Sequence, residues 1–259
     1  EQRDAPDRQR REDGDDGDTP QPCGTAAGAA AADPRTTALL LLAQAAEQQK
    51  DYPAAERALA RINPGNGDAL DVQSRRASLL ARQGKLAQAR ALIRNTPVNT
   101  AELTRNRLLA EVQLLRENKQ WGEAHALLVQ ALVDDPKDTD LLYEQSTVAE
   151  RLGNMAEMEA LLRQVIAIQP NHHHAYNALG YSLADRKQRL DEARALIAKA
   201  LQLAPGEPFI TDSMGWVEYR LGNTAEALRL LNQAYKARPD TEIGAHLGEV
   251  LWAAGQRDE

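Results

Sequence analysis

Residues 178–205, ALGYSLADRKQRLDEARALIAKALQLAP, and residues 213–239, SMGWVEYRLGNTAEALRLLNQAYKARP, contain one pattern twice. Each copy has an early glycine, two alanines seven positions apart and a closing proline. The closing residues Pro205 and Pro239 lie 34 positions apart. A period near 34 is typical of arrays in which each unit is a pair of helices too small to bury a core alone. The stretch therefore predicts stacked helical hairpins.

The small residues of the pattern mark close contacts between helices. We place Gly180 and Ala193 where the two helices of one hairpin meet, because a larger side chain there would overpack the contact at a cost of about 1–3 kcal/mol. Ala200 is expected where the second helix meets the next hairpin. Pro205 has no N–H and cannot continue a helix, so it ends the unit. The second copy repeats these places with Gly215, Ala227, Ala234 and Pro239.

On these residues the chain is identified as a member of the tetratricopeptide-repeat family over residues 36–259. The resemblance implies an all-α solenoid of antiparallel helix hairpins wound into a right-handed superhelix. The expected repeats cover about 36–64, 68–97, 100–136, 137–170, 171–205 and 206–239, with a partial repeat at 241–259. In the fourth repeat Met158 and Val165 stand where the pattern has alanines. We also expect a short second helix in the second repeat and a long first helix in the third.

The N-terminal residues 1–35 have no apolar periodicity. Residues 1–18 contain eight acidic and four basic side chains, and residues 19–35 are mainly Pro, Gly, Ala and Thr. This composition predicts a disordered tail. It serves either as an acidic docking arm or as a solvated spacer, and charge runs favour the spacer. Because the sequence starts at Glu1 and stops inside a repeat, we expect a processed or excised piece of a longer chain.

Charge and composition exclude several classes of partner and site. The formal net charge of −7 and pI near 5.4 argue against nucleic acid, which requires clustered Lys and Arg. No apolar run approaches the roughly 18 residues of a transmembrane helix. The single cysteine, Cys23, cannot form an internal disulfide, and we interpret it as a thiol of the tail.

The sequence contains no motif for catalysis, and we predict a non-enzyme without cofactor. Phosphate-binding loops, His-Glu-x-x-His, Gly-x-Ser-x-Gly and Cys-x-x-Cys are all missing. The run His172-His173-His174 could suggest a metal site. Adjacent residues on a helix point about 100° apart, however, so three in a row cannot face one ion. We interpret the run as a polar helix start and predict no metal site.

Five aromatic residues lie on the first helices of the expected repeats, away from the Gly or Ala contact of each hairpin. In the family this face lines a concave groove, where large aromatics can anchor a peptide. The alternative is that they pack between adjacent first helices and stiffen the superhelix. With polar residues of the same register, they form the predicted partner-binding set: Arg107, Tyr143, Glu144, Asn177, Tyr181, Asp212, Trp216, Tyr219, Arg220, His246, Glu249 and Trp252.

The last third of the chain carries a finer resemblance. Residues 178–186 (ALGYSLADR), 212–222 (DSMGWVEYRLG) and 245–252 (AHLGEVLW) resemble the C-terminal repeats of proteobacterial envelope lipoproteins of the LbcA type. The resemblance implies an adaptor that brings a periplasmic processing protease to cell-wall hydrolase substrates. It also implies the periplasm or the periplasmic face of the outer membrane, with the cytoplasm as the alternative.

A second branch of the family consists of co-chaperones that clamp a C-terminal carboxylate. That clamp needs Lys, Asn and Arg at set groove positions. Here those positions hold Asn177, Tyr181, Asp212 and Ser213, which do not support it.

We therefore predict a scaffold that binds a peptide or protein in its concave groove. The alternative is an assembly module that uses its convex face or its ends. Leu247, Leu251 and Trp252 belong to a helix without a hairpin partner in this sequence, so a homo-oligomer through the open C-terminal end is also expected.

Overall fold

The computed structural model describes residues 34–62 and 69–256, and the predicted tail, with Cys23, lies outside them except for its last two residues. The described residues form thirteen α-helices and no strand, which confirms the all-α repeat fold. The helices are α1 (Pro34–Gln48), α2 (Tyr52–Leu59), α3 (Ala69–Arg82), α4 (Leu86–Arg94), α5 (Ala101–Glu117), α6 (Trp121–Asp134), α7 (Thr139–Arg151), α8 (Met155–Ile168), α9 (His173–Asp185), α10 (Leu190–Leu203), α11 (Pro208–Arg220), α12 (Thr224–Ala237) and α13 (Thr241–Ala253).

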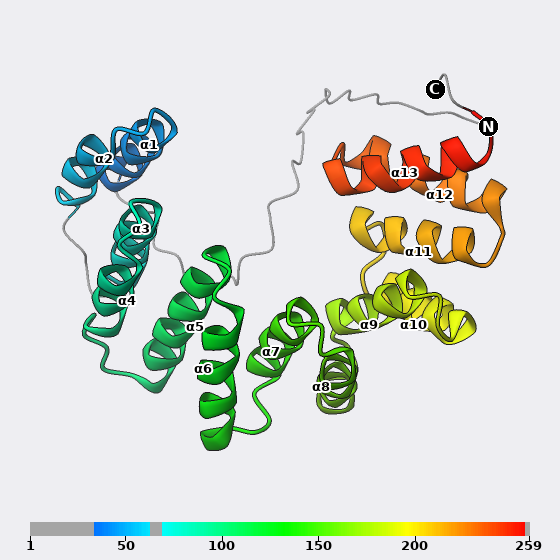
Figure 1. Ribbon diagram of the computed structural model, residues 1–259, viewed down its shortest axis with the longest axis horizontal. Coiled ribbons are helices and arrows are strands. Elements are labelled where there is room, and N and C mark those ends of the chain that lie inside the picture. The colour runs from blue at the N-terminus through cyan, green and yellow to red at the C-terminus, as the bar shows by residue number, and fades with distance from the viewer. Residues whose placement is uncertain (1–33, 63–68, 257–259) are drawn as a thin grey trace, which may run out of the picture.

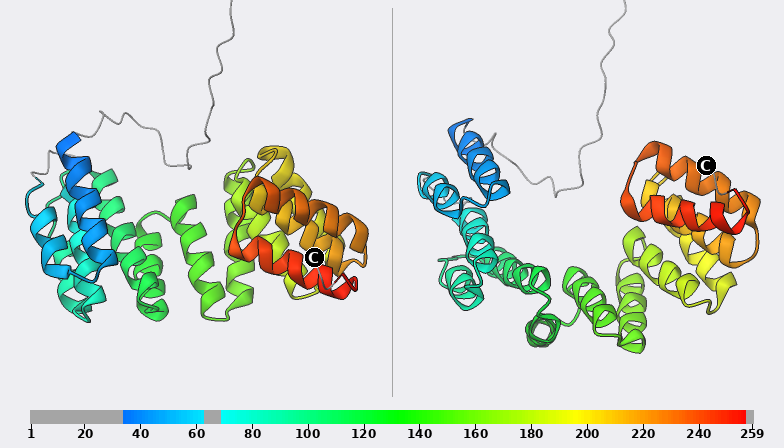
Figure 2. Two further views of the ribbon diagram at one scale, coloured as in Figure 1. Left: turned by 90° about the horizontal axis from the view of Figure 1, so that it is seen from above. Right: turned by 45° about the horizontal axis from the view of Figure 1, so that its top comes forward.

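Successive helices pair into six antiparallel hairpins, from α1–α2 to α11–α12, and α13 packs on the last of them. The hairpins follow an open arc, with the odd-numbered first helices toward its inner side (Figures 1 and 2). Helix α4 has nine residues and α5 has seventeen, where short and long helices were expected. No helix in the described part is long and apolar enough to cross a membrane.

Glycine allows the closest approach of helices within two hairpins. A Cβ atom added at Gly180 would lie 2.6 Å from Ile197 Cγ1 and 2.9 Å from the Ala193 carbonyl oxygen of α10. A Cβ atom at Gly215 would lie 2.8 Å from Leu231 Cγ of α12. All three distances are shorter than side chains tolerate, so each second helix fits only because these residues are glycines. The four alanines of the repeated pattern are also buried.

The apolar core is divided along the arc. Three small clusters cover residues 39–79, 70–114 and 112–148, whereas one larger cluster covers residues 142–250. Met158 and Val165, which replace alanines of the pattern, are buried in the large cluster. The first helices of the C-terminal hairpins are therefore held by one continuous core.

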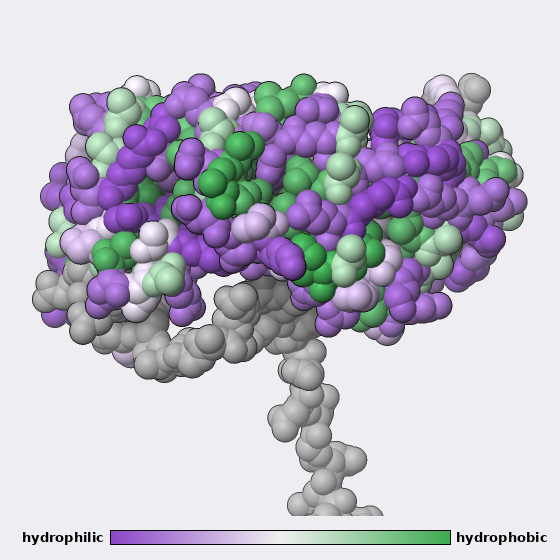
Figure 3. All heavy atoms as spheres, turned by 90° about the horizontal axis from the view of Figure 1, so that it is seen from below, coloured by the Kyte–Doolittle hydropathy of each residue, from purple (hydrophilic) through white to green (hydrophobic). Residues whose placement is uncertain are grey.

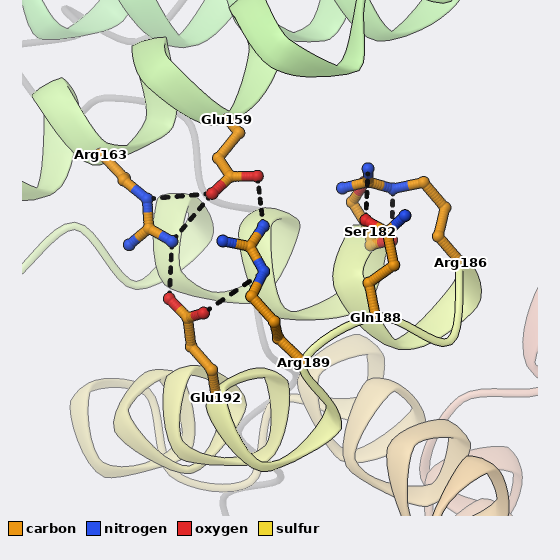
Figure 4. Close-up of polar contacts among 7 residues, drawn as sticks. All are labelled: Glu159, Arg163, Ser182, Arg186, Gln188, Arg189 and Glu192. Atoms are coloured by element: carbon orange, nitrogen blue, oxygen red, sulfur yellow. Dashed lines mark hydrogen bonds and ion pairs between the residues drawn. The ribbon is translucent and has the colours of Figure 1, made fainter.

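The outer side of the arc is mostly hydrophilic, with separate hydrophobic patches (Figure 3). Exposed apolar side chains of the second helices include Val129, Val133 and Ile168. Charged residues also connect neighbouring second helices. Glu159 and Arg163 of α8 pair with Arg189 and Glu192 at the start of α10, forming a closed ring of four charges (Figure 4).

Candidate functional site

A groove of about 620 Å³ lies between the first helices of the C-terminal part of the arc. We call it the inner groove, and four helices line it. Helix α7 contributes Glu150 and Arg151, α9 contributes Asn177, Ala178 and Tyr181, α11 contributes Phe209, Asp212 and Ser213, and α13 contributes Glu242. The repeat brings these positions together because each first helix presents the same face along the stack.

A chain of hydrogen bonds ties three of these helices together. His246 Nδ1 of α13 lies 2.8 Å from Asp212 Oδ2 of α11, and both side chains are buried. His246 Nε2 lies 3.2 Å from the Tyr181 hydroxyl of α9. Because a carboxylate only accepts, Nδ1 donates to Asp212. Nε2 then accepts from the Tyr181 hydroxyl when the ring is neutral and donates to it when the ring is protonated.

The surroundings shift the pKa values of this chain. Burial lowers the pKa of His246, but the Asp212 hydrogen bond and the nearby Asp212, Glu242 and Glu249 charges outweigh it, so the pKa lies above its usual value. Burial raises the pKa of Tyr181, and nearby carboxylates add to the shift. The imidazole is therefore held toward its cationic form, and the phenol remains neutral.

Trp216, predicted as a groove anchor, is only 3% exposed. The His246 ring stacks on it with centroids 4.3 Å apart, and the Arg220 guanidinium carbon lies 4.2 Å from its ring centroid. Tyr219 is a further ring neighbour, at 5.5 Å. Trp216 thus packs between the first helices α11 and α13, the arrangement considered as the alternative for the aromatics. Its role in partner binding stays a prediction.

The structure brings together Asn177, Tyr181, Asp212, Trp216, Tyr219, Arg220 and His246 from the predicted set. Of the other members, Arg107, Tyr143 and Glu144 contact residues outside this group, whereas the charge of Glu249 acts on His246. Arg107 donates to the carbonyl oxygens of Arg94 and Thr96, and Glu144 pairs with Arg116.

Tyr143 of α7 lies against His172, with ring centroids 5.2 Å apart. Burial raises the pKa of Tyr143, with Glu144 a lesser contributor. Glu249 and Trp252 are exposed on α13, and Trp252 is 63% exposed.

Glu150, Arg151, Phe209 and Glu242 line the groove but were missing from the predicted set. The helical period could have found two of them. Glu150 follows Tyr143 by seven positions, and Glu242 precedes His246 by four, so both lie near predicted residues on their helix faces. Extending the face by two turns from Tyr143 and by one turn from His246 would have included these acids.

The inner groove has more acidic than basic groups. Glu150, Asp212 and Glu242 face it, whereas Arg151 is the one arginine or lysine among the lining residues. Burial raises the pKa of Glu150, although Arg151 and Arg186 oppose the shift. The Asn177 Oδ1 atom is buried and has no hydrogen-bond partner among the described residues. The carboxylates and the Asn177 oxygen accept hydrogen bonds, so the groove favours a ligand that donates them.

The histidine run lies at the start of α9, one of the four helices that line the groove. His172 caps the helix, its Nδ1 accepting a hydrogen bond of 3.1 Å from the Ala175 N–H. The rings of His173 and His174 lie 4.0 Å apart. In the described part of the chain, no three His, Cys, Asp or Glu side chains gather in a way that could hold a metal ion.

Comparisons with known proteins agree with this architecture. A family model described as tetratricopeptide repeat matches residues 109–171, 156–208 and 213–259. The TPR repeat-containing protein PA4667 of Pseudomonas aeruginosa is 42% identical over 208 residues, which are 80% of this chain. This chain spans 35% of the length of that relative.

Two solved structures share the fold at low identity. A tetratricopeptide repeat protein from Parabacteroides merdae is 16% identical with a TM-score of 0.58, over 85% of this chain and 87% of that one. TTC0263, a TPR protein from Thermus thermophilus, is 17% identical with a TM-score of 0.55, over 71% of this chain and 100% of that one.

Proposed function

We infer the function of this chain from its family, because the chain belongs to the tetratricopeptide-repeat family. Proteins of this family generally mediate protein–protein interactions. We propose that this chain is a non-enzymatic scaffold that holds an extended segment of a partner protein in the inner groove.

One observation carries this proposal: the groove is a long, open surface made by the first helices of successive hairpins. Its lining combines the aromatic walls of Tyr181 and Phe209 with polar groups whose hydrogen-bonding capacity is unused. Polar groups at fixed places beside apolar walls can set the direction and register of a bound chain. A peptide backbone supplies both donors and acceptors along such a surface.

Filling the groove tests the proposal. Ala178 is a half-buried lining residue, and Ala126 is an exposed residue of α6 outside the groove. Peptides selected from a random twelve-residue phage library on the wild-type chain would be titrated against Ala178→Trp and the matched control Ala126→Trp. We expect the groove variant to weaken binding at least about ten-fold and the control to leave it unchanged. Equal binding by both variants would contradict the proposal.

We further propose that the partner segment comes from an envelope protease or its cell-wall substrates, so that the chain acts as an adaptor. The support is the resemblance of residues 178–186, 212–222 and 245–252 to envelope adaptor lipoproteins. Fractionation of cells that make the full-length protein would test the location. Cross-linking through a photoreactive residue in place of Tyr181, followed by mass spectrometry, would test the partner. A cytoplasmic protein that cross-links no protease or hydrolase would contradict this part.

A second candidate function is self-assembly through α13. Gly248 has the register of Gly180 and Gly215, yet a Cβ atom added there would meet nothing within 4 Å. The α13 face around it is therefore open to a further helix, and a second copy could supply one. Sedimentation of the chain and of Gly248→Trp, which fills the open face, distinguishes the two functions. Concentration-dependent dimers lost in this variant would favour assembly, and a monomer at all concentrations would exclude it.

A further inference from the structure

Among the residues that line the inner groove, Asn177 and Glu150 have acceptor capacity that the protein does not use. Asn177 Oδ1 is a buried oxygen with no partner among the described residues. The half-buried Glu150 carboxylate, within the same part of the chain, makes no hydrogen bond and no ion pair. Because the Asn177 oxygen is shielded from solvent and Glu150 is only half-buried, Glu150 is the acceptor that a ligand can reach, and a ligand that donates a hydrogen bond there supplies a partner that the free protein lacks.

The charges around these acceptors also favour a ligand that donates hydrogen bonds. Three carboxylates and one guanidinium line the groove. Asp212 is buried and bonded to His246, so part of its charge is balanced within the protein. Glu242 is exposed, and no partner of its side chain lies in the described part. The groove therefore keeps an excess of negative charge even when His246 is protonated.

The two arginines beside the groove, Arg186 and Arg220, are each held by contacts within the protein, although Arg186 Nη2 and Arg220 Nε are buried and have no hydrogen-bond partner among the described residues. Arg220 Nη2 lies 3.5 Å from Asp185 Oδ1, and its guanidinium carbon lies over the Trp216 ring. Arg186 donates to the Ser182 carbonyl oxygen and to Gln188, as Figure 4 shows. Arg151 is exposed at the groove wall. An acidic ligand would thus face three carboxylates, with Arg151 as its one accessible counter-ion in the lining.

The walls suit a long side chain with a charged end. Ala178, Phe209 and Tyr181 supply apolar surface, and all three are only partly buried. Lysine and arginine pack their methylene stems on such surface and keep the cationic head beside polar groups. Phe209 already has the guanidinium carbon of Arg238 4.6 Å from its ring centroid, so this ring accepts a cation in the free protein.

We propose that the inner groove selects partner segments with a basic side chain, lysine or arginine, whose head group donates a hydrogen bond to the Glu150 carboxylate. This inference rests on the proposed function and names the chemical class of its ligand. The preference is the opposite of a groove that clamps a carboxylate. It follows from the unused acceptors and the surplus of carboxylates, and it predicts that acidic segments are rejected.

The test uses three fluorescein-labelled dodecapeptides of Ala, Gly and Leu that differ only at positions 4, 6 and 8, where they carry lysine, glutamine or glutamate. Fluorescence anisotropy at 150 mM NaCl measures binding to the 259-residue chain. We expect the lysine peptide to bind at least about ten-fold more tightly than the glutamine peptide, since charge-assisted hydrogen bonds are the stronger kind. The glutamate peptide should bind more weakly than both.

Two matched variants separate groove recognition from general attraction to an acidic protein. Glu150→Gln removes a groove carboxylate, and Asp191→Asn removes one exposed carboxylate from the second helix α10. Both change the net charge equally. We expect Glu150→Gln to weaken lysine-peptide binding about ten-fold and Asp191→Asn to change it less than two-fold. Equal losses in the two variants would overturn the proposal, because they would mean that only net charge matters.

The remaining outcomes distinguish failure of this inference from failure of the proposed function. If all three peptides bind equally and Ala178→Trp abolishes their binding, the groove binds peptides without a basic preference, so this inference fails and the proposed function stands. If the lysine peptide does not bind at all, the inference is wrong. If library-selected peptides also ignore Ala178→Trp, the proposed function fails with it.

Discussion

Replacing Gly180 by alanine should destabilise the protein, whereas the same change at Gly248 should stabilise it. Both glycines lie in the middle of a first helix, α9 and α13, and occupy the same place in the repeat. Alanine in the middle of a helix is more favourable than glycine by about 0.5–1 kcal/mol. That gain is common to both variants, so the difference between them isolates the packing against a second helix.

The packing cost follows from the distances. At Gly180 the new Cβ would lie 2.6 Å from Ile197 Cγ1, which can turn away, and 2.9 Å from the Ala193 carbonyl oxygen, which is backbone. Helix α10 must therefore move, and overpacking of this kind costs about 1–3 kcal/mol. At Gly248 the new atom meets nothing within 4 Å. The two variants should thus differ by about 1–3 kcal/mol.

Thermal unfolding followed by far-ultraviolet circular dichroism measures the effect. For a chain of this size about 1 kcal/mol shifts the Tm by about 2–4 °C, so the Tm values should differ by roughly 2–12 °C. Amide exchange should also speed up in α9 and α10 for Gly180→Ala alone, because repeat arrays lose structure locally. If the two variants shift the Tm equally and in the same direction, the close approach of α9 and α10 is not what requires glycine.

Three further predictions concern the buried and charged groups. Trp216→Ala should lower the free energy of unfolding by about 3–5 kcal/mol in a urea titration, because the ring is buried; a loss below about 1 kcal/mol would refute its core position. The raised pKa of His246 means that its bond to Asp212 stabilises the fold fully below about pH 6.5 and that this contribution fades as pH rises through the folded pKa. The stability difference between wild type and His246→Gln should therefore be larger at pH 5.5 than at pH 9, and an NMR titration midpoint below 6.5 would contradict this. Glu159, whose pKa the hydrogen bond from Arg189 lowers to about 2, should stabilise the fold above about pH 4.3 and lose that effect as pH falls to about 2. The Tm difference between wild type and Glu159→Gln should shrink over that range, and a constant difference would exclude the charge ring as its source.

The repeat architecture was predictable from spacing because its contacts are local. Gly180 and Gly215 meet helices that follow them within one hairpin, so the 34-residue period alone indicated where small residues were needed. The faces of the first helices followed from the helical period, and they brought Asn177, Tyr181 and Asp212 to the lining of one groove.

The burial of the Trp216 ring was not predictable in the same way. It depends on His246, thirty positions later, and on the rotation between successive hairpins, which the spacing of small residues does not determine. Glu150 and Glu242 are a different case, because they share helix faces with the predicted residues Tyr143 and His246, and the helical period could have indicated them.

The division of the core has a consequence for cooperativity. The hairpins from α1 to α6 rest on three small apolar clusters, whereas the helices that form the inner groove share a single large one. In a linear array each unit is stabilised mainly by its nearest neighbours. Terminal hairpins that share only a small core with their neighbours therefore unfold first. Heating should therefore release the N-terminal hairpins before the C-terminal block melts. Over that interval the molecule would remain able to hold a ligand while its other half behaves as an unfolded polymer.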